Sequence, residues 1–590
     1  MKSKSIIGAA LAAMVTLGVT TSCQDMFDID STRVIVENKH NLDSSADSAY
    51  STIGVLQAMR QIADRYIILG EVRGDLLEIN DYSKTSVRNL AEFNFEDENE
   101  YLNVRDYYAI INNCNYALAK MDTTISKNNE RVMVDEYAAL IGIRAWTYLQ
   151  LAINYGEVPF YLNPITSLAE AEKEYPKKDV KAIAEELIPD LIAYADYDLP
   201  AFTGEIATAV NVYPPLQLVL GDYYLWSGDY ANACATYLDY MTTHPKFNYA
   251  YGDATNRETF RGYMGLDGAA IKCTQRGTFV NIVANSKWVP YQTKDAKENL
   301  AYIPLESSSA NGTVSTIGTL FTSEDNTHSL NPSTYLKELS SKQAYIDAKE
   351  NEKGEMTYTV NSLAGDVRYK YYLATPVLAE DDEMQVYDKL VSANSSTGMI
   401  SHVNIYRRAI VYLRAAEALN GLAEQTDSSK YSVMAFNLMK DAYKVFFPEG
   451  HVSEKELREA FIGVHARGCG AVRVDDQYFV LKPRAIANRL GLLEEGVEVS
   501  DSVLATQLTL TDTIKYVDEL IIDELALESA VEGNRFGDLI RFAKRRQAWG
   551  ESDWKDLLAK RVASRKGAEA FDQELYDKLQ DESNWYLPLK

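Results

Sequence analysis

Residues 144–160 constrain the fold more than any other stretch, because a long amphipathic pattern there runs into a defined stop. Apolar or aromatic side chains recur at helical spacing at Ile141, Ala145, Tyr148, Leu149, Ala152 and Tyr155. This spacing predicts a helix with one face packed inward. Gly156 follows the last periodic residue, where a left-handed cap is favoured, and Pro159 prevents the helix from resuming. We therefore expect a corner in a helical scaffold, followed by an extended segment over residues 158–162.

Other stretches indicate that most of the scaffold is helical. Apolar periodicity over helical lengths also covers residues 43–69, 101–121, 132–155 and 179–195, the last interrupted by Pro189. Residues 217–245 fit the tetratricopeptide pattern at Leu220, Gly221, Tyr224, Ala233, Tyr237 and Pro245, and lack its opening Trp. Small residues in this pattern let two helices approach, and the aromatics fill the groove between them. Because residues 405–422 open a similar hairpin, the sequence predicts a mainly α fold with tetratricopeptide-like hairpins.

Residues 247–403 differ from the helical blocks on either side. Gly, Ser, Thr and Asn become more frequent, and segments such as residues 307–319 are typical of loops or short strands. A long irregular insert in a helical frame is where binding function is usually found. We divide the chain into residues 1–22, residues 23–246 with the first helices, and residues 247–590, which include this loop-rich insert.

The N-terminus has the pattern of an export signal. Lys2 and Lys4 precede an apolar run over residues 6–19, which is the length of a signal peptide rather than of a membrane anchor. Small residues at positions 20–22 then lead directly to Cys23, as at a bacterial lipoprotein cleavage site. We expect Cys23 to become the first residue and to carry the lipid, with an ordinary secretory signal and a chance Cys as the alternative.

Composition excludes some partners and favours others. A formal net charge of −26 argues against nucleic acid, because phosphate would be repelled. The chain has 40 tyrosines against 6 tryptophans and 17 phenylalanines. Tyrosine offers a flat apolar ring with one hydroxyl, which suits sugar-like ligands, although packing between helices is the commoner role of any single tyrosine.

The sequence carries no recognisable catalytic or metal-binding motif. Its 6 histidines are scattered without H-E-x-x-H spacing, and neither a G-x-S-x-G elbow nor a phosphate-binding loop occurs. The internal cysteines are Cys114, Cys234, Cys273 and Cys469, without C-x-x-C spacing, so buried free thiols are favoured over a zinc site or a disulfide framework. We expect no catalysis, no cofactor and no metal.

Four stretches together carry a family resemblance. They are residues 69–75 (LGEVRGD), 144–160, 406–419 (YRRAIVYLRAAEAL) and 523–541 (DELALESAVEGNRFGDLIR), and the ending at residues 585–589 (WYLPL) adds to them. In this order behind Cys23, they resemble the SusD/RagB family of Bacteroidetes outer-membrane lipoproteins over essentially the whole mature chain. The resemblance implies a lipid-anchored, surface-exposed receptor that captures an oligosaccharide and passes it to a SusC-like TonB-dependent barrel, toward which the tetratricopeptide helices would face.

The resemblance also implies where ligand contacts lie. The family places them just after the early Arg-x-Asp segment and in the mid-chain insert. In this chain that points to Arg73, Asp81, Tyr82, Trp288 and Tyr291. For each of these residues, packing in the interior is an equal alternative.

Two other functions stay open at this point. One is a peptide-binding receptor of the RagB kind, and a remote one is an extracellular glycosidase. The negative charge disfavours acidic glycans and could suit cationic peptides, although net charge says little about a local site. The opposite charges at Glu532, Arg535, Asp538 and Arg541 recur every three residues, so we interpret them as structural ion pairs around a helix break at Gly533.

Overall fold

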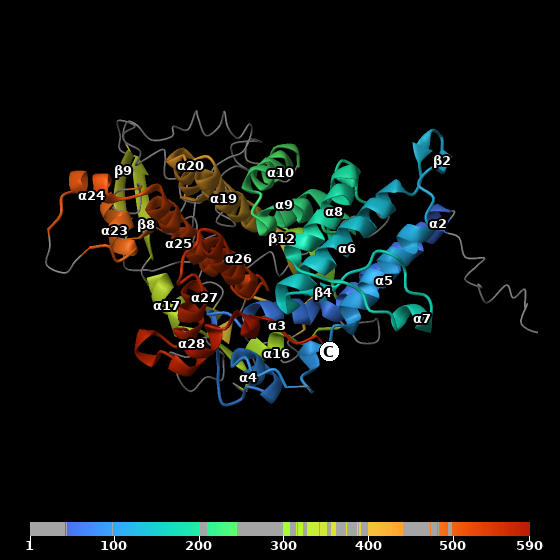
Figure 1. Cartoon of the computed structure of the whole chain (residues 1–590), viewed down its shortest axis with the longest axis horizontal. Helices are drawn as coiled ribbons and strands as arrows, with labels where there is room; N and C mark the ends of the chain where they lie inside the picture. The colour runs from blue at the N-terminus through green and yellow to red at the C-terminus, as the bar shows by residue number, and fades with distance from the viewer. Residues whose placement is uncertain are drawn as a thin grey trace, which may run out of the picture.

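The computed structural model shows a predominantly helical molecule (Figure 1). It describes Leu42 and residues 44–96, 98–200, 209–244, 299–306, 314–315, 317–321, 327–341, 343–350, 356–361, 373–374, 386–387, 389–390, 399–440, 472–473, 481, 483–493 and 498–589. In Figure 1 the N-terminal helices α5, α6 and α8 lie on one side and the C-terminal helices α25 to α28 on the other. Helices α9, α10 and α19 lie between them. The predicted mainly α fold is confirmed.

The first half of the chain is a series of packed helices. They are α2 (Ser45–Met59), α3 (Ala63–Glu71), α4 (Thr85–Ala91), α5 (Arg105–Lys120), α6 (Val134–Tyr155), α7 (Leu168–Ala171), α8 (Val180–Tyr194), α9 (Leu216–Ser227) and α10 (Tyr230–Thr243). Helix α5 packs on α6, α8 on α9, and α9 on α10. The stretch 43–69, predicted as one helix, is divided into α2 and α3 by a 3₁₀ turn at Arg60–Ile62. The other predicted helices are present within a few residues of their expected ends.

The predicted corner after α6 is present, with a different backbone conformation. Gly156 ends the helix at φ +74° and ψ −106°, so its φ is positive but its ψ lies outside the left-handed helical region. A Cβ at Gly156 would lie 3.1 Å from Cγ of Tyr586, so the ring of Tyr586 closes the corner. The chain continues as the short strand β4 (Val158–Pro159), which pairs with β5 (Lys177–Lys178).

The tetratricopeptide pattern corresponds to the hairpin of α9 and α10. A Cβ at Gly221 would lie 2.6 Å from the ring of Tyr237, so this glycine lets the ring pack directly on α9. The Tyr237 hydroxyl donates to Asp222 Oδ1 at 2.5 Å, and Ala233 is fully buried between the helices. Pro245 lies outside the described residues. The small-and-aromatic pattern therefore has the packing role that the sequence predicts.

The second half of the chain continues the helical layer. Its helices are α16 (Gly318–Phe321), α17 (Thr334–Ser341), α19 (Arg408–Gln425), α20 (Ser429–Lys440), α23 (Pro483–Arg489), α24 (Asp501–Gln507), α25 (Leu510–Ser529), α26 (Arg535–Ala548), α27 (Asp556–Ala563) and α28 (Gln573–Leu579). Helix α19 packs against α10, α20 and α25. The hairpin expected from residue 405 begins later, at Arg408, because the preceding residues form a strand.

Strands are short and lie mostly in the insert. Antiparallel pairs join β6 (Asn299–Pro304) to β12 (His402–Arg407), and β8 (Gln343–Glu350) to β9 (Met356–Asn361) and β13 (Val472–Arg473). Another pair joins β1 (Leu77–Ile79), directly after the first helices, to β7 (Leu330–Pro332). This last pair brings the early segment and the insert together.

A buried ionic junction joins the two ends of the sequence. The carboxylate of Glu71, at the end of α3, accepts backbone N–H groups of Val531, Gly533 and Arg535 at 2.8–3.4 Å. The Arg535 guanidinium donates to both oxygens of Asp75, at 2.6 and 2.7 Å, and both side chains are fully buried. The junction fixes the segment after α3 to the start of α26, and that segment leads into β1.

The charged set around Gly533 is structural, and its pairing differs in part from the prediction. Asp538 and Arg541 pair with each other at 2.8 Å, as the three-residue spacing predicts. Glu532, however, binds Lys389 and Arg407, and Arg535 binds Asp75. The reason is that α25 already ends at Ser529 and α26 begins at Arg535, so Glu532 lies in the turn between them, where Gly533 has φ +87°. Glu532 and Arg535 are therefore not neighbours on one helix face.

Candidate functional site

Arg73 is the first of the predicted ligand contacts, and the structure assigns it a different role. Its side chain has no exposed surface. Its Nε donates to Leu69 O and its Nη1 to Trp585 O, both at 3.0 Å, while its Nη2 donates to Asn154 Oδ1. Burial lowers the pKa of the guanidinium to about 9. The structure therefore places Arg73 in the interior, which is the alternative left open by the sequence, and its guanidinium joins α3 to α6 and to the C-terminal segment.

Asp81 and Tyr82 lie on a tight turn between β1 and α4. Asn80 organises the turn, since its Oδ1 accepts the backbone N–H of Tyr82 at 2.9 Å and its carbonyl accepts that of Ser83 at 3.0 Å. The Ser83 hydroxyl accepts the backbone N–H of Asn80 at 2.8 Å, which closes the turn. This is the local chemistry expected of Asn and Ser, whose short polar side chains replace backbone partners in turns.

The turn is also fixed to the insert. The Asn80 amide donates to His328 O at 3.0 Å, and the Ser83 hydroxyl donates to Ser329 O at 2.5 Å. On the same side, His328 Nε2 contacts Asn331 Oδ1 at 2.7 Å, and burial lowers the pKa of this imidazole. Residues 80–83 are therefore hydrogen-bonded to a segment that lies about 250 residues later in the sequence. We call residues 80–83 the Tyr82 turn.

The Tyr82 turn presents its aromatic ring to solvent. The Tyr82 side chain is 59% exposed, although its backbone is held on both sides, and Asp81 beside it is also exposed. An exposed aromatic ring on an ordered backbone can bind a flat apolar surface, and little conformational entropy is lost because the loop is already ordered. A neighbouring carboxylate can accept hydrogen bonds from hydroxyl groups. The arrangement suits the face of a sugar ring.

The predicted contacts in the insert, Trp288 and Tyr291, lie outside the described residues and stay predictions. Asn80, Ser83 and His328, which hold the turn, were not identified from the sequence. The N-D-Y-S stretch at residues 80–83 is a recognisable turn signal, so the first two could have been found. The contribution of His328 depends on a pairing across the chain that no local pattern indicates.

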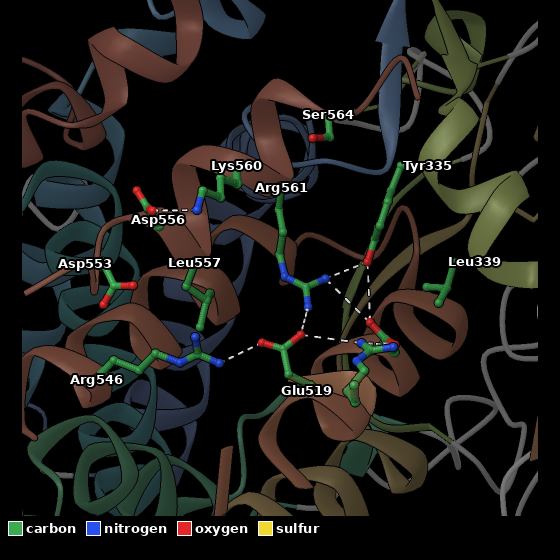
Figure 2. A pocket seen from close by; sticks show the side chains of 12 residues that line it. Tyr335, Leu339, Glu519, Arg546, Asp553, Asp556, Leu557, Lys560, Arg561 and Ser564 are labelled. Atoms are coloured by element: carbon green, nitrogen blue, oxygen red, sulfur yellow. Dashed lines mark hydrogen bonds and ion pairs between the residues drawn. The ribbon is translucent and has the colours of Figure 1, made fainter. Parts of the chain in front are cut away.

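A cavity of about 400 Å³ is lined by side chains of α17, α23, α25, α26 and α27 (Figure 2). Its charged residues are Arg489, Arg546, Lys560, Arg561, Glu519, Asp523, Asp553 and Asp556. Glu519 lies among three guanidinium groups. Its Oε1 accepts from Arg546 at 2.6 Å, and its Oε2 accepts from Arg561. Figure 2 shows these side chains pointing toward one another from separate helices.

The charges of this cavity compensate one another. Burial raises the pKa of Glu519, but the surrounding arginines outweigh it and lower the pKa to about 2. Asp523 pairs with Arg489 at 2.6 Å, and Asp556 pairs with Lys560 at 2.7 Å. Four cations thus face four carboxylates. We interpret the cavity as a structural ion network that connects the C-terminal helices.

The described part of the chain gives little evidence for a metal site, a reactive thiol or a membrane-spanning helix. Among those residues, no group of three His, Cys, Asp or Glu side chains is arranged to hold a metal ion. Cys114 and Cys234 are free, and burial raises the pKa of each thiol to about 12. Within the same residues, no helix is long and apolar enough to span a membrane.

Comparison with solved structures identifies the fold. No protein-family model and no curated protein matches the sequence. A SusD superfamily protein from Bacteroides thetaiotaomicron VPI-5482 matches with a TM-score of 0.55 at 15% identity, over 92% of this chain and 96% of that one. The chain has the SusD-like fold. A SusD superfamily protein from Bacteroides vulgatus ATCC 8482 gives a TM-score of 0.54 at 15% identity, with the same coverage.

A third structure with the SusD-like fold carries a more specific name. It is a SusD-like carbohydrate binding protein from Bacteroides vulgatus ATCC 8482, with a TM-score of 0.50 at 15% identity over 85% of this chain and 84% of that one. At such low identity the likeness establishes the architecture. The resemblance of the four sequence stretches to the SusD/RagB family therefore agrees with the observed fold.

Proposed function

We propose that this chain is a cell-surface lipoprotein that binds an oligosaccharide at the Tyr82 turn and delivers it to a SusC-like TonB-dependent transporter. The observation that carries the proposal is the exposed Tyr82 ring on a turn that directly follows β1 and is hydrogen-bonded to Ser329 and to Asn331 of β7. The SusD-like fold supports it, because one structure with this fold is named for carbohydrate binding. Anchoring through Cys23 rests on the export signal of residues 1–22.

Binding would depend on stacking of the sugar on Tyr82 and on polar contacts around it. Aromatic side chains supply most of the contact area in such sites, and a few polar groups fix the orientation of the ligand. Asp81 is the polar group beside the ring in the described residues, and Trp288 and Tyr291 are the contacts proposed from the insert. The proposed role is non-catalytic, so the ligand should leave the site unchanged.

Replacing Tyr82 with alanine should weaken glycan binding about 5- to 30-fold, as expected for loss of an aromatic contact worth 1–2 kcal/mol. The melting temperature should stay nearly unchanged, because the side chain is mostly exposed. Affinity electrophoresis against a panel of polysaccharides would identify the ligand, and calorimetric titration would measure the change.

Tyr50→Ala is the matched control, since Tyr50 is 73% exposed but lies on α2. An equal loss of binding in both variants would contradict a site at Tyr82. Wild-type protein that is retarded by no glycan would favour the peptide-binding alternative. Cleavage products after long incubation with a bound glycan would show an enzyme instead of a receptor.

A further inference from the structure

His328 lies buried against the Tyr82 turn. The residue is 1% exposed, and its backbone carbonyl accepts the side-chain amide of Asn80 at 3.0 Å. The next residue, Ser329, contacts the turn twice: its carbonyl accepts from the Ser83 hydroxyl, and its own hydroxyl donates to Tyr82 O at 3.3 Å. The imidazole therefore belongs to the segment that holds the backbone under the exposed Tyr82 ring.

The hydrogen bonds of the turn determine which nitrogen of the imidazole carries the proton. A backbone N–H can only donate, so the Tyr82 N–H at 2.9 Å identifies the Asn80 atom that faces it as Oδ1. The amide nitrogen of Asn80 then points to the insert, where it donates to His328 O and, at 3.3 Å, to Asn331 Oδ1. Because this Asn331 atom is an acceptor, His328 Nε2, which lies 2.7 Å from it, must be the donor. The neutral ring thus carries its proton on Nε2.

The other ring nitrogen, Nδ1, is buried and has no hydrogen-bond partner in the described structure. In the neutral ring this nitrogen carries only a lone pair. Protonation would place an N–H group and a positive charge at the same point, where no acceptor is available. A buried charged group without a partner costs more free energy than a buried neutral one. The interior beneath the turn therefore accommodates the neutral ring and disfavours the protonated ring.

The charged side chains on the neighbouring elements do not offset this cost. Strands β1 and β11 and helix α16 contact β7, and α4 contacts β1. The charged residues of these described segments are Glu78 on β1, Asp81 in the turn, Lys84 and Arg88 at α4, and Lys389 after β11. Glu78 accepts the backbone N–H of Thr334, Arg88 donates to Asn80 O, Lys389 pairs with Glu532, and Asp81 and Lys84 are exposed. Burial therefore lowers the pKa of the imidazole, and it outweighs the oxygen of Asn331, which favours the protonated ring.

We propose that His328 is a positioning residue for glycan binding: its neutral ring holds the Tyr82 turn in the shape that binds, and acid releases the turn. The proposal rests on the proposed function for the glycan site at Tyr82. A protonated ring would have to reach water, and its movement would pull the His328 carbonyl and Ser329 away from Asn80 and Ser83. The Tyr82 ring would then lose the ordered backbone that keeps the entropy cost of binding low. Binding should therefore be tight near neutral pH and weak in acid.

The direction of this pH dependence follows from the lowered pKa of His328. The ordered turn takes up a proton less readily than a histidine in an open chain, whose pKa is about 6.5. The stability that the neutral ring contributes is therefore fully present above about pH 6.5 and is lost as the pH falls through the lower pKa of the folded protein. Glycan affinity should be constant above about pH 7 and should fall below that pKa, by up to about tenfold per pH unit, which is the limit for linkage to a single proton.

The direct test compares the wild type with His328→Gln and needs no ligand. The amide nitrogen of glutamine can take the place of Nε2 and donate to Asn331, but it does not titrate. Hydrogen exchange of the full chain is measured at equal pH in both proteins, by mass spectrometry of peptides that contain residues 80–83. The two proteins should exchange alike at pH 7.5, and the wild type should exchange at least about threefold faster at pH 4.5, because opening of the turn is then linked to proton uptake. NMR titration of ¹⁵N-histidine-labelled protein, with the His328 signal assigned by its absence from the variant, should give a pKa below 6.5.

Affinity electrophoresis at pH 7.5 and pH 4.5 tests the consequence for binding, in gels that contain whichever polysaccharide of the panel most retards the wild type. The wild type should lose retardation in acid, and His328→Gln should keep it. His328→Leu, which lacks the donor to Asn331, should bind weakly at both pH values. His402→Gln is the matched control, since His402 is also 1% exposed but lies on β12, where its ring contacts Ser401. This control should keep the acid sensitivity of the wild type.

The two proposals can fail separately. Equal acid sensitivity of the wild type and His328→Gln would assign the titration to another group and overturn the role of His328, as would an imidazole pKa at or above 6.5. Loss of glycan binding in Tyr82→Ala, in a protein whose turn exchanges alike at both pH values, would leave the proposed function intact and overturn only this inference. Exchange that is faster in acid and normal in His328→Gln, in a protein whose glycan binding is unaffected by Tyr82→Ala, would support the hold of His328 on the turn and contradict the glycan site at Tyr82.

Discussion

Replacing Asp75 with asparagine is expected to lower the free energy of unfolding by about 3–5 kcal/mol, the cost typical of removing one partner from a buried ion pair. Asp75 and Arg535 are both fully buried, and they share two parallel hydrogen bonds of 2.6 and 2.7 Å. Asparagine has nearly the same shape but no charge, so Arg535 would remain buried as an uncompensated cation. Arg535 would keep its bond to Ile522 O at 2.8 Å, which does not replace a carboxylate.

The measurement is denaturant unfolding followed by circular dichroism, with Asp501→Asn as the matched control. Asp501 pairs with Arg484 at 2.9 Å through the same two functional groups, but the side chains are 54% and 38% exposed. The control should change stability by no more than about 1 kcal/mol, because water solvates both charges after the pair is broken. Similar losses in the two variants would mean that burial adds nothing to the Asp75–Arg535 pair.

The Asp75–Arg535 pair shows which contacts could be predicted from the sequence and which could not. The spacing of Glu532, Arg535, Asp538 and Arg541 predicted ion pairing, and each of these residues is paired. Partners beyond the local helix could not be predicted. Asp75 lies 460 residues before Arg535, and a pattern of three-residue spacing contains no information about contacts at that distance. Local periodicity identifies helices and their breaks, whereas the partners of buried charges depend on how the helices pack.

The candidate site, too, could be predicted only in part from the sequence. Tyr82 was selected from a resemblance, by its position after the Arg-x-Asp segment, and the structure shows an exposed ring there on an ordered turn. Arg73, nine residues earlier in that region, turns inward because Trp585 and Asn154 supply acceptors there. Nothing in residues 69–75 distinguishes an inward from an outward arginine.

Replacing Gly70 with alanine should lower the free energy of unfolding by about 3 kcal/mol or more, at the upper end of the range for overpacked sites. A Cβ at Gly70 would lie 1.8 Å from Gly533 O and 2.3 Å from its carbonyl carbon. Both contacts are with backbone, so no side-chain rotation can relieve them. The two glycines interlock, because a Cβ at Gly533 would in turn lie 2.8 Å from Tyr66 O. Helix α3 would have to move away from the turn before α26.

Thermal unfolding of Gly70→Ala beside Gly54→Ala tests this argument. Gly54 lies within α2, and a Cβ there would meet no atom within 4 Å. Alanine at that position should leave stability unchanged or raise it by about 0.5–1 kcal/mol, because glycine is the poorer helix former. A melting temperature for Gly70→Ala equal to that of the wild type would show that α3 does not pack as closely on the turn as described. Because α3 leads through Glu71 and Asp75 into β1 and the Tyr82 turn, Gly70→Ala should also weaken glycan binding, and unlike Tyr82→Ala it should do so together with a fall in melting temperature.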